Sequence, residues 1–132
     1  MDQVTELSGG SIKFEYYPAE QLGKARDMLA MIGTGVADVA YVAPSYISDK
    51  LPASAVGELP WGYSDPCVGT KAFWNLAKEG GTLWENELKA VGMRVVFALM
   101  LPPNQLVMAA EGFSDFDSLK GRKVRTSGGT KD

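Results

Sequence analysis

The sequence predicts an α/β fold, and three observations indicate it. Residues 12–17 alternate apolar and polar side chains with the period of two that a half-buried strand requires. Residues 21–34 place apolar side chains at helical spacing, and residues 36–44 form a second apolar stretch. Residues 95–101, VVFALML, are continuously apolar, as in a central strand that is covered on both faces.

The first elements have the order strand, helix, strand within about 30 residues, which is typical of a βαβ unit with parallel strands. A short helix is expected at residues 2–7 before them. Ile12, Phe14 and Tyr16 supply the buried face of the first strand, and Pro18 ends it. The helix after it should stop near Gly33.

The middle of the chain carries two helix start signals. Asp65 followed by Pro66 is typical of an N-cap and a first helical residue, and an apolar stripe runs from there to Gly80. Thr82 and Glu85 then form a T-x-x-E capping box, which predicts a second helix directly after the first.

The last third begins with Pro102 and Pro103, which end the apolar strand. A domain crossing is predicted there, at residues 102–104. A strand over residues 105–109, a short helix over residues 114–120 and a strand that carries Arg125 are expected to follow.

Composition excludes several classes of protein. The formal net charge of −3 and the pI near 5.0 argue against a nucleic-acid partner. The absence of histidine removes Ser-His-Asp and Cys-His catalysis and HExxH metal sites. Cys67 is the single cysteine, so neither an intramolecular disulfide nor a cysteine metal cluster is expected, and no cofactor or metal site is predicted.

Membrane and export signals are also not evident in the sequence. The longest apolar run is far shorter than the roughly 20 residues that span a bilayer. The first residues, MDQVTE, lack the basic segment and apolar stretch of a signal peptide.

Three stretches carry a resemblance to a known family. They are YYPAEQLGKARDML (16–29), GVADVAYVAP (35–44) and SLKGRKVRTSGG (118–129), in that order along the chain. Together they resemble the periplasmic solute-binding proteins of tripartite ATP-independent (TRAP) transporters, the DctP-like family. None of the three would suffice alone.

The resemblance implies a periplasmic-binding-protein-like fold of type II style, with two α/β domains and an organic acid held in the cleft between them. By that likeness, residues 1–103 are expected to form most of domain I without its first strand. Residues 104–132 are expected to be the crossover and the beginning of domain II, so that the chain covers about the first half of such a protein. A periplasmic location and permease subunits as partners are likewise implied.

Arg125 matches the family's arginine that pairs with the ligand carboxylate. A guanidinium has paired planar donors that fit a carboxylate and stays charged at any working pH, which agrees with that role. The alternative is that Arg125 belongs to a solvated basic run with Lys120, Arg122 and Lys123.

The loop after the second strand is the next candidate. Pro44, Ser45 and Tyr46 stand at the carboxyl end of that strand, where ligands bind in open α/β sheets. They are expected to form part of the cleft wall. The alternative is a plain turn that ends the strand.

Three further residues are candidates for ligand contact. Asn104 and Gln105 are expected to hydrogen-bond the ligand, or else to be a polar hinge after the two prolines. Trp61 either lines the cleft or covers the sheet. Glu15 and Glu58 have no partner at a spacing that marks an acid/base pair, and are interpreted as surface or turn residues.

The sequence therefore predicts an extracytoplasmic solute receptor that binds an organic acid and delivers it to a TRAP permease, and not an enzyme. Two alternatives stay open. One is a small α/β enzyme domain with an anion-binding loop at SGGTK (127–131), although that loop does not have the order or spacing of a P-loop. The other is a truncated chain that binds nothing.

Overall fold

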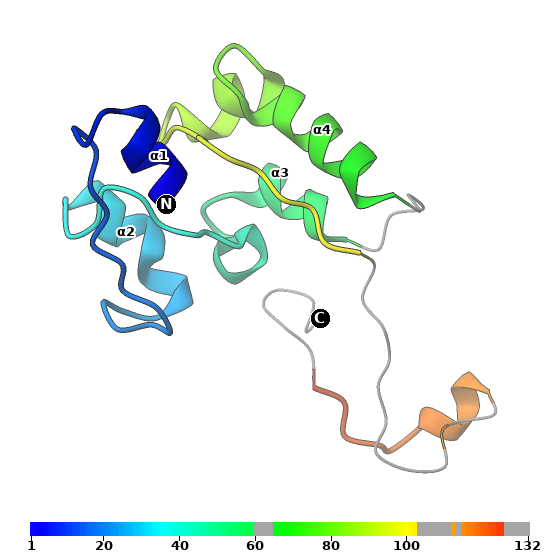
Figure 1. The fold of residues 1–132 in the computed structure, drawn as a ribbon. Coiled ribbons are helices and arrows are strands. Elements are labelled where there is room, and N and C mark those ends of the chain that lie inside the picture. The colour runs from blue at the N-terminus through cyan, green and yellow to red at the C-terminus, as the bar shows by residue number, and fades with distance from the viewer. Residues whose placement is uncertain (60–64, 103–111, 113–114, 126–132) are drawn as a thin grey trace. The chain divides into compact units, whose positions relative to one another are not determined.

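The protein is represented by a computed structural model that describes residues 1–59, 65–102, 112 and 115–125. It divides into two compact units, Met1–Tyr41 and Val42–Asp132. Within the described residues, all regular secondary structure is helical (Figure 1).

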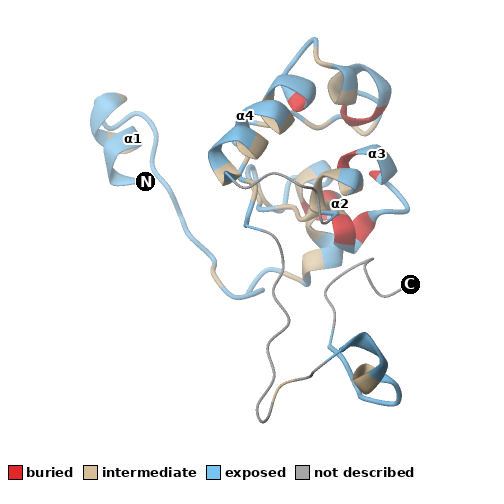
Figure 2. Cartoon of the chain, turned by 90° about the vertical axis from the view of Figure 1, so that its right-hand side faces the viewer, coloured by how far each residue is buried: buried red, intermediate tan, exposed pale blue. Residues whose placement is uncertain are grey.

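The unit Met1–Tyr41 contains α1 (Asp2–Leu7), the 3-10 turn η1 (Ala25–Asp27) and α2 (Met28–Gly33). α1 has no buried residue and is mostly exposed in Figure 2. α2 buries Leu29 and Met31, which form the described core of this unit.

The helix predicted over residues 21–34 is shorter than expected. Lys24 has an extended backbone (φ −74, ψ 156), so helical structure begins only after it. The Glu20 carboxylate accepts a hydrogen bond from the Ala25 amide at 2.8 Å and so fixes this start. The predicted stop is confirmed, because Gly35 follows α2 with a φ of 74° and its amide donates to the Ile32 carbonyl.

The described residues of the unit Val42–Asp132 form six helical elements. They are η2 (Pro44–Ile47), α3 (Pro52–Ala55), η3 (Val56–Glu58), α4 (Pro66–Ala77), the π-helical turn η4 (Trp84–Leu88) and η5 (Phe116–Leu119).

Among the described residues of this unit, the buried apolar side chains are Ile47, Leu51, Ala77 and Leu88. Figure 2 shows buried segments around α3 and near the end of α4. Glycine at position 57 allows η3 to approach α4, because a Cβ there would lie 2.9 Å from the Phe73 ring. η3 and α4 therefore pack more closely than a larger residue at 57 would allow.

α4 confirms the first of the two predicted helices. The Asp65 side chain accepts a hydrogen bond from the Cys67 amide at 2.8 Å, and Pro66 occupies the first turn. The helix ends where Lys78 turns to an extended backbone, two residues before Gly80.

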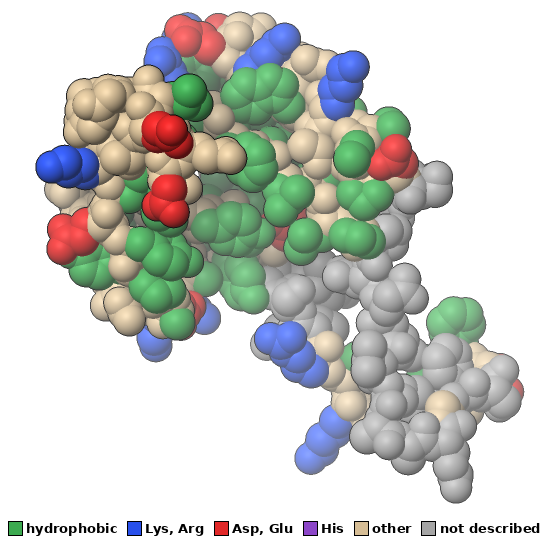
Figure 3. Space-filling model, in the orientation of Figure 1, with side chains coloured by type: hydrophobic (Ala, Val, Ile, Leu, Met, Phe, Trp, Pro, Cys, Tyr) green, Lys and Arg blue, Asp and Glu red, His purple; other side chains and the backbone are tan. Residues whose placement is uncertain are grey.

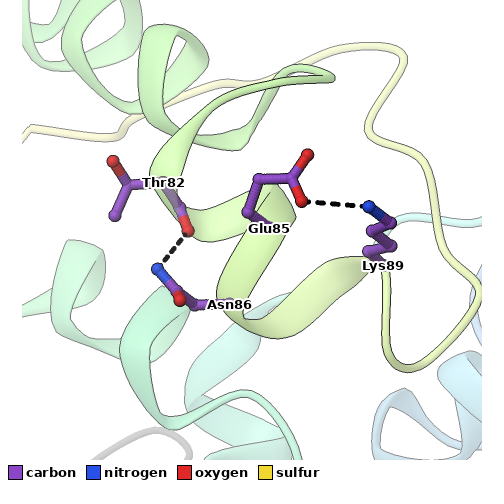
Figure 4. A network of polar contacts seen from close by, with 4 residues as sticks. All are labelled: Thr82, Glu85, Asn86 and Lys89. Carbon is purple, nitrogen blue, oxygen red and sulfur yellow. Dashed lines mark hydrogen bonds and ion pairs between the residues drawn. The ribbon is translucent and has the colours of Figure 1, made fainter.

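The second predicted helix starts where expected but does not form the capping box. The Glu85 carboxylate points forward to Lys89 Nζ at 3.0 Å, and the Thr82 carbonyl accepts from Asn86 Nδ2 at 2.9 Å (Figure 4). This segment continues as the π-helical turn η4, in which Lys89 N donates to the carbonyl of Trp84, five residues earlier.

The predicted strands are not seen in the described residues. Residues 12–17, 36–43 and 95–101 are irregular, and their apolar side chains are largely exposed: Tyr16 is 66%, Val39 65% and Phe97 75% exposed. A strand exists only when its backbone groups pair with a neighbouring strand, and none of these segments is a strand in the described part of the chain. The α/β class is therefore not confirmed, and many hydrophobic side chains are visible at the surface in Figure 3.

In the last described segment, too, a helical element is present but the predicted strand is not. The helix predicted over residues 114–120 is η5, whose start is capped by the Asp115 carboxylate, accepting from Ser118 N at 2.9 Å. Residues 122–125 are irregular instead of a strand. The predicted strand at 105–109 and the boundary between 103 and 104 lie outside the described residues. None of the described helices is long and apolar enough to cross a bilayer.

Candidate functional site

A pocket of about 220 Å³ lies among η2, α3 and η3. It is lined by Ser45, Ser48, Pro52, Ala55, Val56, Glu58 and Leu59. All these residues lie in the stretch 45–59, so the pocket is built from consecutive turns of the chain.

The start of η2 is held by a hydrogen bond across the pocket. Pro44 occupies the first turn of η2 and has no amide hydrogen, and the next amide, of Ser45, donates to Glu58 Oε2 at 3.2 Å. Ser45 is buried and Glu58 is part-buried. The carboxylate therefore caps η2 and faces the pocket at the same time.

A second glutamate fixes the start of α3, which lines the pocket with Pro52 and Ala55. Glu87, from η4, is buried with 7% of its surface exposed, and its carboxylate accepts from the amides of Ala53 at 2.7 Å and Ser54 at 2.9 Å. The Ser54 hydroxyl donates to the same carboxylate. Because Pro52 has no amide hydrogen, Glu87 takes both remaining donors of the first three residues of α3.

The pocket presents a hydrogen-bond acceptor, the Glu58 carboxylate, among mostly apolar side chains. Glu58 is the residue with a charge among the pocket lining, and an ionised carboxylate only accepts hydrogen bonds. The hydroxyls of Ser45 and Ser48 donate and accept, while the remaining walls are apolar. Among the described residues, no group of three or more His, Cys, Asp or Glu is placed to hold a metal ion.

The structure brings only some of the predicted site residues together. Pro44, Ser45 and Tyr46 lie side by side in η2, with Ser45 lining the pocket and Tyr46 exposed. Arg125 is exposed, at the end of the irregular segment after η5. Asn104, Gln105 and Trp61 lie outside the described residues.

The two glutamates were not found by sequence reasoning. Glu58 lies in the turn η3, in agreement with a surface or turn residue, but it is also part-buried and accepts a hydrogen bond from the Ser45 amide 13 positions earlier. Glu87 acts over 33 and 34 positions, on Ser54 and Ala53. No periodicity marks such pairs, because the separation is set by how the turns pack.

One side chain of the unit Met1–Tyr41, that of Tyr17, has a shifted pKa. The pKa of Tyr17 is raised above its usual value by a hydrogen bond with the Glu15 side chain, by desolvation and by the negative charge of Glu15. Tyr17 is exposed and does not line the pocket.

Comparison with known proteins gives the family. Residues 1–128 match DctP, described as bacterial extracellular solute-binding protein, family 7. The chain belongs to this family. Solute-binding proteins of this family bind small molecules and work with the membrane subunits of TRAP transporters, and their fold is periplasmic-binding-protein-like.

Two curated relatives share parts of this family 7 chain. It is 27% identical over 124 residues, or 93% of its length, to a protein of Comamonas testosteroni named outer membrane transporter protein TsaT. It is 36% identical over 59 residues, or 45% of its length, to the uncharacterized protein YiiZ of Salmonella typhimurium. The chain spans 35% of the first relative and 18% of the second. No solved structure matches it.

Proposed function

We propose that the chain is part of an extracytoplasmic receptor that binds an organic acid and delivers it to the membrane subunits of a TRAP transporter. Membership of the solute-binding family over residues 1–128 carries this proposal. The acid, the cleft and the delivery step go beyond the family assignment.

Arg125 is proposed to pair with the carboxylate of the acid. Its guanidinium is exposed, so it is accessible to a ligand. Paired N–H donors bind a carboxylate in two parallel hydrogen bonds, which are stronger than bonds between neutral groups. Closing a second domain over this pair would remove water from it and so favour the closed, liganded state.

The residues of η2 are proposed to form one wall of the site. Pro44 and Tyr46 flank Ser45, and the exposed ring of Tyr46 offers an apolar surface with a hydroxyl at its edge. Asn104 and Gln105 are proposed to contribute hydrogen bonds to the ligand, and Trp61 an aromatic contact. This arrangement binds and releases a ligand unchanged, so no catalytic role is assigned to any of these residues.

The test is a thermal-shift screen of the complete gene product against monocarboxylates, dicarboxylates, keto acids and sugar acids. A ligand that binds only the native state raises the melting temperature. The screen is repeated with Arg125→Ala and with the control Arg122→Ala, which removes the same charge from an exposed position three residues earlier.

We expect one class of acid to stabilise the parent and Arg122→Ala, and Arg125→Ala to lose at least about tenfold in affinity, as for a hydrogen bond to a charged group. Equal losses in both variants would show that only the overall charge matters. If no acid shifts the parent protein, the receptor proposal is wrong.

A further inference from the structure

The residues next to Arg125 carry a local excess of positive charge. Arg122, Lys123 and Arg125 fall within four consecutive positions, residues 122–125, which are called the basic segment below. All residues of the basic segment are exposed, so their charges act through water. The formal net charge of the whole chain is −3, so the sign of this segment is opposite to that of the chain.

The acidic side chains of η5 do not compensate this charge. Asp117 forms an ion pair with Lys120, in which Oδ1 of Asp117 lies 3.1 Å from the lysine Nζ. Within the part of the chain that the structure describes, no carboxylate forms an ion pair with Arg122, Lys123 or Arg125. The basic segment therefore keeps all of its positive charges.

The end of η5 holds the first of these charges in place. The Arg122 amide donates to the Leu119 carbonyl at 3.0 Å, and Arg122 Nε donates to the Ser118 carbonyl at 3.1 Å. Basic side chains commonly bond the last carbonyls of a helical element in this way. Because a carbonyl has no net charge, Arg122 keeps its full charge while the hydrogen bond restricts where the guanidinium lies.

Covalent geometry alone keeps the charges of the basic segment close to Arg125. Consecutive Cα atoms are about 3.8 Å apart, so the Cα atoms of Lys123 and Arg122 lie within about 7.6 Å and 11.4 Å of that of Arg125. Charges in water act over about 10 Å at 0.1 M salt and further at lower salt. At such a distance and low salt, one charge raises the local concentration of a monovalent anion about twofold.

We propose that Arg122 and Lys123 raise the local concentration of small anions beside Arg125 and so speed the capture of an acid there. The inference rests on the proposed function, in which Arg125 binds the carboxylate, and it adds two steering residues that act before the ligand makes contact. Such attraction weakens with salt and changes mainly the rate of association.

The first measurement needs no natural ligand. Two nitroxides with the same ring, the anionic carboxy-PROXYL and the neutral carbamoyl-PROXYL, are added in turn to the complete gene product, and NMR measures the relaxation of each backbone amide proton. The ratio of the two enhancements gives the local excess of the anion over the neutral probe. It is recorded at about 0.01 M and about 1 M salt, where charges act over about 30 Å and about 3 Å.

The variants are Arg122→Ala, Lys123→Ala and the control Lys71→Ala, which removes the same charge from an exposed residue of α4. At low salt we expect an anion excess of at least about threefold at the amides of the basic segment, and a fall of about twofold in each of the first two variants. Lys71→Ala should match the parent, and high salt should abolish the excess. No excess at low salt, or an equal fall in all three variants, would overturn the inference.

Arg125→Ala separates the field of the basic segment from direct binding to one guanidinium, because the carboxylate of the anionic probe is itself able to pair with Arg125. We expect about half of the anion excess to remain in this variant, since Arg122 and Lys123 keep their charges. If Arg125→Ala alone abolishes the excess, the two neighbours do not contribute and the inference is wrong.

Stopped-flow kinetics measures capture with the acid class found in the thermal-shift screen. At low salt, Arg122→Ala and Lys123→Ala should each lower the association rate constant about twofold and leave the dissociation rate constant unchanged. Arg125→Ala should mainly raise the dissociation rate constant, because it removes a contact. The loss of affinity in Arg122→Ala is then about twofold, well short of the loss of about tenfold expected for Arg125→Ala. Unchanged association rate constants in Arg122→Ala and Lys123→Ala would contradict steering.

The two measurements separate this inference from the proposed function. If acids bind the parent but the anion excess is absent, the inference is wrong and the proposed function stands. If the excess is present and no acid binds, the receptor proposal is wrong, while the collection of anions by the basic segment stands without it.

Discussion

The carboxylate of Glu87 accepts hydrogen bonds from the Ala53 and Ser54 amides and from the Ser54 hydroxyl, in a site with almost no contact with water. Two positions earlier, Glu85 makes an ion pair with Lys89 in which both side chains are about half exposed or more (Figure 4). Two glutamates on one short element are therefore expected to contribute very differently to the free energy of unfolding. Burial and the number of bonded donors, not residue type, make this difference.

Glu87→Ala is expected to destabilise the protein by about 2–4 kcal/mol, because it leaves the buried amide and hydroxyl of Ser54 and the part-buried amide of Ala53 without a partner. The matched control Glu85→Ala should cost below about 0.5 kcal/mol, as exposed ion pairs usually do. Urea unfolding of both variants measures the difference. Similar midpoints for the two would contradict the role assigned to Glu87.

At the scale of elements, α4 shows what a local signal is able to predict. Asp65 and Pro66 mark its start, and the structure confirms both the cap and its hydrogen bond to the Cys67 amide. A cap acts on amides two or three residues away, so the sequence contains both partners. The start of η5 is capped in the same way, because the Asp115 side chain accepts from the amide of Ser118, three residues later.

Asp65→Ala is expected to lower the free energy of unfolding by about 1 kcal/mol, since the Cys67 amide loses its acceptor. Asp65→Asn should lose only a fraction of this, because the asparagine side-chain oxygen also accepts. The measurement is denaturant unfolding followed by helical circular dichroism. A loss in Asp65→Asn as large as in Asp65→Ala would show that the charge, and not the hydrogen bond, is responsible.

Apolar patterning predicts strands that the structure does not show in its described residues. Residues 95–101 have the composition of a buried strand, yet Val96, Phe97 and Leu99 are exposed. Alternation and apolar runs show which side chains favour burial, but they do not supply a partner for the backbone. A sheet needs that partner, and it comes from elsewhere in a chain.

At the scale of the whole molecule, hydrogen exchange distinguishes the irregular conformation of residues 94–99 from a strand. Their amides make no hydrogen bond to another described residue, whereas the Met100 amide donates to Thr70 Oγ1 at 2.9 Å. We expect residues 94–99 to exchange quickly and Met100 more slowly. The amide of Lys78, which donates to the Trp74 carbonyl at 2.9 Å at the end of α4, provides the protected reference.

Protection across residues 95–99 equal to that of α4 would contradict this expectation and would show that the apolar run is paired in a sheet. A further check replaces Thr70 with alanine, which should speed exchange at Met100 without affecting Lys78. Thr70→Ser keeps the hydroxyl and should leave both unchanged.

The sequence by itself determined the family, the start of α4 and the stop of α2. Each of these depends on residue types, or on partners a few positions apart, so the order of residues contains the whole interaction. The role of Arg125 is also a sequence prediction, and it stays one.

Only the tertiary structure decided the pocket and the two glutamates that frame it. Glu58 reaches Ser45 over 13 positions and Glu87 reaches Ala53 over 34, and neither spacing follows from a helical or strand repeat. These contacts exist because packed turns bring distant backbone amides to a carboxylate that is part-buried at Glu58 and buried at Glu87. In such places an unpaired donor would cost more than the bond contributes.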